Sequence, residues 1–120
     1  MRAPIPGITV VVTGSKDYDN TAKVYEVLDA LLPIRLLLHG GCPTLRRWAI
    51  IGIDAIAETW SVERRVDSEV VKAPNRRYGL QNKAFLAHNP DIVVIFSSNR
   101  GTSDLIKRAR KIGVQIQEVP

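Results

Sequence analysis

The stretch DIVVIFSSNRGTSDLIKRARKIG, residues 91–113, contains a complete strand–loop–helix unit and decides the fold class. Residues 91–96 form a continuous apolar run, which is typical of a central strand buried on both faces. Residues 97–101 predict a tight loop, and the apolar stripe of residues 102–112 predicts a helix that stops at Gly113. A parallel strand followed by a helix is the repeating unit of α/β proteins.

Strands and helices alternate in the same way along the rest of the chain. The other predicted strands are 8–13, 34–39, 114–119 and a weaker one within 64–72. The other predicted helices are one between Asp19 or Asn20 as its N-cap and Pro33, one at 53–62 and one at 79–88. We therefore expect residues 1–120 to form one α/β domain, a Rossmann-like three-layer α/β/α fold with a mostly parallel sheet of about five strands.

Composition limits the function classes. The 120 residues carry 17 basic and 12 acidic side chains, and the net charge of +5 either favours an anionic partner or serves solubility alone. Cys42 is the only cysteine, so we expect no disulfide framework and assign no metal site and no cofactor. No apolar run reaches the roughly 20 residues of a membrane span. We expect no membrane association and a cytoplasmic location, in the host if the chain is phage-encoded.

Three glycine-bearing loops follow strands of the predicted sheet, at the edge where ligands bind in such folds. Glycine lets the backbone approach a ligand, while free amides at a helix start and basic or hydroxyl side chains attract phosphate. Each feature also fits a plain structural role, a satisfied buried histidine or an ordinary helix cap among them. The candidate ligand-binding residues in the three loops are Gly14, Ser15 and Lys16; His39, Gly40 and Gly41; and Asn99, Arg100, Gly101, Thr102 and Ser103.

The helix expected after Gly40-Gly41 is delayed until the turn Gly52-Ile53-Asp54. Arg46, Arg47 and Trp48 lie within the delay. Residues 45–51 could form an extra helical turn that packs on the sheet or on another subunit. Alternatively, the guanidinium and indole groups could cover a bound ligand as a lid. We favour the packing or oligomer interpretation.

Four motifs occur in a recognisable order. The first is VVVTGSKDY at 10–18, and the second is His39-Gly40-Gly41 followed by Gly52-Ile53-Asp54, Ala57 and Trp60. The third is the pair Gln81-Asn82, and the fourth runs from Pro90-Asp91 through the 91–96 strand to Gly101-Thr102. In this order they resemble the SLOG superfamily, the Rossmann-like group that unites DNA-processing Smf/DprA proteins with LONELY GUY (LOG) enzymes and lysine decarboxylase-like proteins. The similarity is greatest to its small stand-alone YspA-like members.

The resemblance implies a pocket for a nucleotide or a nucleotide-derived ligand. Phosphate would bind at the Gly101-Thr102 helix start, Asp54 would take a ribose hydroxyl, and Asn82 would bond the polar edge of the ligand. The resemblance also implies a homodimer or higher oligomer, because LOG-like relatives are commonly dimers. We look for that interface at residues 45–51.

The catalytic residues of the LOG enzymes are not matched. Those enzymes carry P-G-G-x-G-T-x-x-E, whose glutamate acts with an arginine on the N-glycosidic bond. Here Leu105 stands at the glutamate position and Gln81 at the arginine position, and leucine cannot handle a proton. We therefore favour a binding module for sensing or sequestration, with catalytic residues unknown.

Two alternatives stay open. One is a nucleoside-monophosphate N-glycosidase with atypical catalytic residues, for which Asp104 and Asp54 are the nearest carboxylates. The other is nucleic-acid binding, as in the DprA-like relatives, through the basic residues of 64–77 or 107–111. Nucleic acid is not the expected partner, because aromatic content is only 6% and stacking platforms are therefore scarce.

Overall fold

The computed structural model describes residues 6–15, 17–41, 44–46, 49–98 and 100–120. One sheet of five parallel strands, in the order β5-β2-β1-β6-β7, confirms the predicted Rossmann-like α/β fold. Its strands are β1 (Ile8–Gly14), β2 (Ile34–His39), β5 (Ser68–Val70), β6 (Ile92–Phe96) and β7 (Gln115–Val119). The helices are α1 (Thr21–Ala30), α2 (Ile53–Arg64), α3 (Tyr78–Ala87) and α4 (Arg100–Lys111), with a short 3-10 turn at Pro74–Arg76. None of the described helices is long and apolar enough to cross a membrane.

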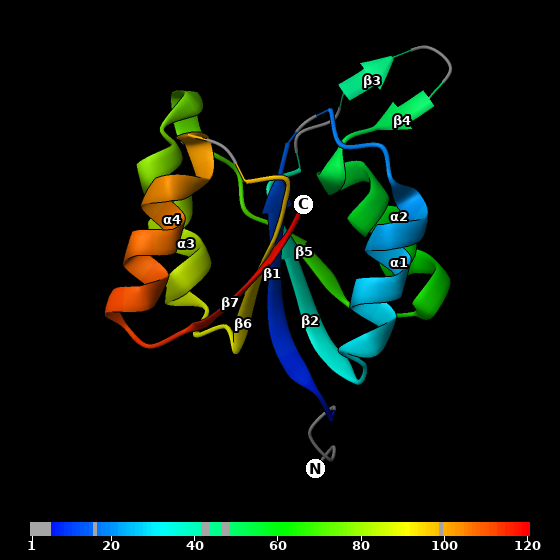
Figure 1. Ribbon diagram of the computed structural model, residues 1–120, viewed down its shortest axis with the longest axis horizontal. Helices are drawn as coiled ribbons and strands as arrows, with labels where there is room; N and C mark the ends of the chain where they lie inside the picture. Colours follow the sequence, from blue (N-terminus) through cyan, green and yellow to red (C-terminus); the bar gives the residue numbers. More distant parts are fainter. Residues whose placement is uncertain (1–5, 16, 42–43, 47–48, 99) are drawn as a thin grey trace.

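Helices cover both faces of the sheet, which forms the middle layer (Figure 1). The core against α1 and α2 takes Val10 and Val12 of β1, whereas the core against α3 and α4 takes Val11. Successive side chains of a strand point to opposite faces, so a strand covered on both sides must be apolar throughout. This is why the apolar runs at 8–13 and 91–96 predicted central strands correctly.

The strand order reverses beside β1. The chain passes from β1 to β2 and β5 on one side, then returns to place β6 against the other side of β1. A reversal of this kind opens a crevice beyond the carboxyl ends of the strands. Gly14 ends β1 there with φ of 154°, and a Cβ at this position would overlap the carbonyl of Phe96 in β6. Glycine is therefore required for the two strands to end side by side.

The delay between β2 and α2 holds a hairpin. Residues 44–46 (β3, Thr44–Arg46) pair antiparallel with residues 49–51 (β4, Ala49–Ile51), so the expected extra helical turn is wrong. A helix this short is unstable by itself, whereas the two segments can satisfy each other's backbone groups across the hairpin. The hairpin extends beyond the sheet on the side of α1 and α2 (Figure 1). Arg47 and Trp48, named in the lid interpretation, lie outside the described residues.

Candidate functional site

A cavity of about 430 Å³ lies at the carboxyl edge of the sheet, within the size range of small-molecule sites. The loops and helix starts around the reversal of strand order all contribute to its walls. Thr13, Gly14, Ser15 and Asp17 come from the end of β1 and its loop, and Gly40 follows β2. Gly52, Ile53 and Asp54 begin α2, Tyr78, Gln81 and Asn82 come from α3, and Thr102 and Leu105 come from α4. The three glycine-bearing loops therefore meet at one cavity.

Three helices begin at this cavity. Ile53 and Tyr78 are the first residues of α2 and α3, and Thr102 lies in the first turn of α4. Among the described residues no side chain caps the start of α2 or α3, and no acidic residue stands in the first turn of α3 or α4. The first turn of α2 carries Asp54, whose carboxylate opposes an anion. The first amides of a helix carry a partial positive charge, so the starts of α3 and α4 favour an anion in the space beside them.

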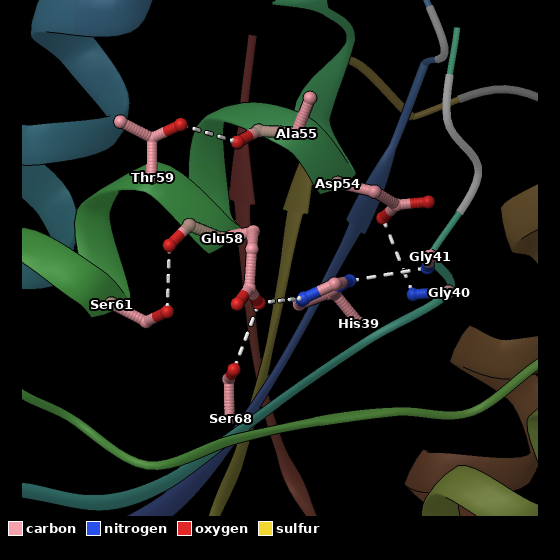
Figure 2. A network of polar contacts seen from close by, with 9 residues as sticks. All are labelled: His39, Gly40, Gly41, Asp54, Ala55, Glu58, Thr59, Ser61 and Ser68. Carbon is pink, nitrogen blue, oxygen red and sulfur yellow. Dashed lines mark hydrogen bonds and ion pairs between the residues drawn. The ribbon is translucent and has the colours of Figure 1, made fainter. Parts of the chain in front are cut away.

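His39, at the end of β2, is used within the protein. It is 2% exposed, and its Nδ1 accepts the amide N–H of Gly41 at 3.1 Å. The other ring nitrogen, Nε2, then carries the proton and donates it to Glu58 of α2 at 2.6 Å (Figure 2). Both ring nitrogens are thus engaged, and His39 does not line the cavity.

Glu58 connects this histidine to a third element. Its Oε2 also accepts the hydroxyl of Ser68 in β5 at 2.8 Å (Figure 2). The hydrogen bond from His39, with a smaller contribution from Ser68, holds the pKa of Glu58 below its ordinary value although partial burial opposes this. We call His39, Gly41, Glu58 and Ser68 the histidine cluster; it joins β2, α2 and β5.

Gly41 completes the turn after β2. Its φ of 61° is in the left-handed region, and a Cβ there would overlap the side chain of Val70. Gly40, by contrast, is needed for space. A Cβ at Gly40 would lie 2.7 Å from Nε2 of Gln81 and 3.1 Å from Oδ2 of Asp54, and its amide donates to Oδ1 of Asp54 at 3.3 Å. The absence of a side chain at Gly40 lets Asp54 of α2 and Gln81 of α3 approach the end of β2.

On the other side of the sheet, α3 and α4 are joined by polar side chains. Nδ2 of Asn82 donates to Oδ2 of Asp104 at 3.0 Å, and Nε of Arg108 donates to the same oxygen at 2.7 Å. The hydrogen bond from Asn82, followed by that from Arg108, holds the pKa of Asp104 below its ordinary value. We call Asn82, Asp104 and Arg108 the amide cluster. Asn82 is 4% exposed and lines the cavity.

The structure brings together six of the candidate residues, which line the cavity: Gly14, Ser15, Gly40, Asp54, Asn82 and Thr102. His39 and Gly41 support the wall instead, and Ser103 is exposed and does not line the cavity. Lys16 and Asn99 lie outside the described residues, and Arg100 and Gly101 are placed only as the first residues of α4. Their roles in ligand binding stay predictions.

Sequence reasoning missed several lining residues. Tyr78 shares a helix face with Asn82, because it stands four positions before it, and Leu105 stands one turn after Thr102. Gln81, next to Asn82 in the chain, also lines the cavity. Helical spacing from the two residues already chosen would have found Tyr78 and Leu105. Thr13 and Asp17 flank the Gly14-Ser15 turn, and only their proximity to it could have pointed to them.

This architecture, a parallel sheet with a cavity at the point where its strand order reverses, defines a Rossmann-like α/β domain, and folds of this class bind ligands at that point. A model of the YspA, cpYpsA-related SLOG family matches residues 8–78, more than half of the chain. The chain therefore belongs to this family, as the sequence motifs predicted. Searches of curated proteins and of solved structures found no significant match.

Proposed function

We propose that this protein binds a nucleotide or a nucleotide-derived small molecule, for sensing or sequestration. The observation that carries the proposal is the meeting of three helix starts and three glycine-bearing loops at one cavity. Partial positive charge from several helix starts favours a phosphate group, and each start contributes about 0.3–1 kcal/mol. Family membership supports a nucleotide-related ligand of this kind.

Binding without turnover fits the chemistry of the cavity better than hydrolysis. Leu105, at the position where LOG enzymes carry glutamate, is 1% exposed and lines the cavity. Asp104 next to it accepts hydrogen bonds from Asn82 and Arg108 and does not line the cavity, which disfavours it as a substitute acid. Asp54 is the carboxylate of α2 that faces the cavity, and it would accept a ribose hydroxyl.

Native mass spectrometry of the protein purified from cells tests this proposal first, by looking for a co-purified nucleotide. Calorimetric titration with AMP, CMP and NAD follows, with adenosine as the matched control that lacks phosphate. We expect AMP to bind at least tenfold more tightly than adenosine, since phosphate would interact with the helix starts. Equal binding of the two, or binding of neither together with an empty purified protein, would overturn the proposal. Release of ribose 5-phosphate from AMP would show an N-glycosidase instead.

The proposal includes a cytoplasmic protein that forms a homodimer or higher oligomer. The β3-β4 hairpin extends beyond the sheet and is the segment we expect at the interface between copies (Figure 1). Light scattering after size-exclusion chromatography measures the oligomeric state. A monomer over the micromolar range would overturn this part of the proposal and leave the ligand proposal intact.

A further inference from the structure

Asn82 is a buried residue whose side-chain NH₂ group is hydrogen-bonded within the protein, whereas its side-chain carbonyl group has no hydrogen bond to the described residues. Its Nδ2 donates to Asp104, but within the part of the chain that the structure describes no hydrogen bond reaches its carbonyl oxygen Oδ1. Asn82 is 4% exposed and lines the cavity. Among the buried side-chain atoms of the described residues only the Tyr18 hydroxyl lacks a partner, so Oδ1 of Asn82 is open to solvent, and a group that enters the cavity can reach it.

The direction of the Asn82 amide follows from the chemistry of its partner. Asp104 already accepts Nε of Arg108 at 2.7 Å, and an ionised carboxylate is an acceptor only. The atom of Asn82 that faces Asp104 must therefore be the NH₂ group, because two oxygens would repel each other. Since the two ends of a planar amide point apart, the carbonyl oxygen faces away from Asp104.

Gln81, the preceding residue of α3, is oriented in the same way. Its Nε2 donates to the backbone carbonyl of Val71 at 2.8 Å, which is also an acceptor only. Its carbonyl oxygen Oε1 has no hydrogen bond to any of the described residues, and Gln81 lines the cavity. Two neighbouring side chains of α3 therefore each use one N–H of the amide within the protein, while the carbonyl oxygen accepts no hydrogen bond from the described residues.

We propose that α3 presents the carbonyl oxygens of Asn82 and Gln81 to the ligand, so that this wall selects an N–H or O–H donor, and that Asp104 is the positioning residue that fixes the Asn82 amide. The inference rests on the proposed function and names the part of the ligand that α3 recognises. The same donor chemistry has two sources in a nucleotide, a ribose hydroxyl and the amino group of a base. A keto oxygen or a second phosphate that faces these two carbonyl oxygens would meet acceptors and bind more weakly.

Matched ligand pairs identify the donor. AMP is compared by calorimetry with 2′-deoxy-AMP and 3′-deoxy-AMP, which each lack one hydroxyl, and with IMP, whose keto oxygen replaces the amino group. We expect at least one of these replacements to weaken binding about tenfold, since a ligand that covers the acceptor without donating to it costs about 1–3 kcal/mol. Weaker binding of 2′-deoxy-AMP or 3′-deoxy-AMP would identify a ribose hydroxyl as the donor. Weaker binding of IMP would identify the amino group of the base.

Variants of Asp104 test the positioning role. The carboxylate is half exposed, so Asp104→Ala should fold, but it leaves the Asn82 amide free to turn either end toward the ligand. For the ligand pair that the wild type discriminates, we expect the ratio of affinities to fall from about tenfold to less than about threefold. The ratio of AMP affinity to adenosine affinity should stay unchanged. Asp104→Asn keeps an acceptor for the Asn82 N–H and should restore most of the discrimination. Glu26→Gln, an exposed acid on α1, is the control.

The side-chain amide spectrum of ¹⁵N-labelled protein without ligand gives an independent measurement. The Asn82 proton that faces Asp104 should resonate downfield and return toward the exposed asparagines in Asp104→Ala. An unchanged signal would overturn the positioning role. AMP binding with no discrimination in any of the three pairs would overturn the inference alone, whereas binding of no nucleotide would overturn the proposed function as well.

Discussion

The histidine cluster and the amide cluster stand on opposite faces of the same sheet, and both hold the wall of one cavity. In the histidine cluster, both ring nitrogens of His39 are engaged within the protein, by Gly41 and by Glu58. In the amide cluster, Asn82 donates to Asp104 while its carbonyl oxygen accepts no hydrogen bond from the described residues. The first cluster therefore uses its polar groups within the fold, whereas the second leaves one carbonyl oxygen without a partner among the described residues.

This difference shows that a conspicuous motif need not contact a ligand. The H-G-G run at 39–41 is the most visible feature of the sequence, yet only Gly40 of the three lines the cavity. Asn82 lies in an ordinary helix and becomes noticeable only when its burial and its partner are known. Position at a strand end brings a residue to the ligand edge, and its hydrogen-bond partners decide whether it is available.

Leucine in place of the central residue of each cluster should give the largest difference in stability between the two clusters. His39→Leu removes two partly buried hydrogen bonds, and we expect it to lower the free energy of unfolding by about 2–3 kcal/mol. Asn82→Leu places an apolar group beside Leu105, and we expect it to change stability by less than about 1 kcal/mol. Urea unfolding measures both values.

Ligand binding should show the opposite order for the same two variants. We expect Asn82→Leu to weaken AMP binding about tenfold or more, since it removes the carbonyl acceptor. Folded His39→Leu should keep AMP affinity within about threefold, because the ring does not line the cavity. A strong loss of affinity in His39→Leu, or none in Asn82→Leu, would reverse the roles assigned to the two clusters.

Two glycine-to-alanine substitutions compare the backbone at the two clusters, one at Gly41 of the histidine cluster and one at Gly79, near Arg108 of the amide cluster. Gly41→Ala would require a left-handed backbone and displacement of Val70, so we expect a loss of about 2 kcal/mol in the free energy of unfolding. Gly79 in α3 has room, since a Cβ would meet only the end of Arg108 at 3.9 Å. Gly79→Ala should be neutral or stabilise by up to about 0.5 kcal/mol. Equal effects in thermal unfolding would contradict the conformational role of Gly41.

The sequence predicted the sheet well because burial on both faces leaves a plain apolar pattern. The runs at 8–13 and 91–96, the N-cap Asn20 and the stop at Gly113 all lie where local chemistry dominates, and the structure confirms them. Asn20 accepts the amide of Lys23 at 3.1 Å, as a cap should. In such segments, neighbouring residues are enough to fix the local structure.

Features that depend on distant residues could not be predicted. The β3-β4 hairpin pairs two three-residue segments that carry no strand pattern of their own, so an extra helical turn was an equally reasonable expectation. Glu58 stands 19 residues from His39 and Asp104 stands 22 residues from Asn82, and no local pattern identifies these partners. The location of the cavity was predictable from topology, whereas the free polar atoms in it required the structure.

Tyr18, which contacts the start of α2, offers a smaller test. Its ring packs on Phe96 with centroids 5.4 Å apart, and its carbonyl accepts the amide of Gly52 at the start of α2. Its hydroxyl oxygen is buried and has no hydrogen-bond partner among the residues described. Tyr18→Phe removes this unsatisfied group, and we expect the free energy of unfolding to rise by about 1 kcal/mol. A loss of stability would show that the hydroxyl has a partner in solution.

The pH dependence of stability gives the smallest expected effect and tests the bond at the centre of the histidine cluster. The folded-state pKa of Glu58 lies below its ordinary value of 4.5, chiefly because His39 donates to it. A depressed carboxyl pKa stabilises the fold above about pH 4.5 and ceases to do so as pH falls through the folded-state value. The stability difference between the wild type and Glu58→Gln should therefore be constant near neutral pH and shrink below 4.5. Urea unfolding between pH 3 and 7 measures it, and a difference that grows on acidification would mean that the carboxylate is not the stabilised form.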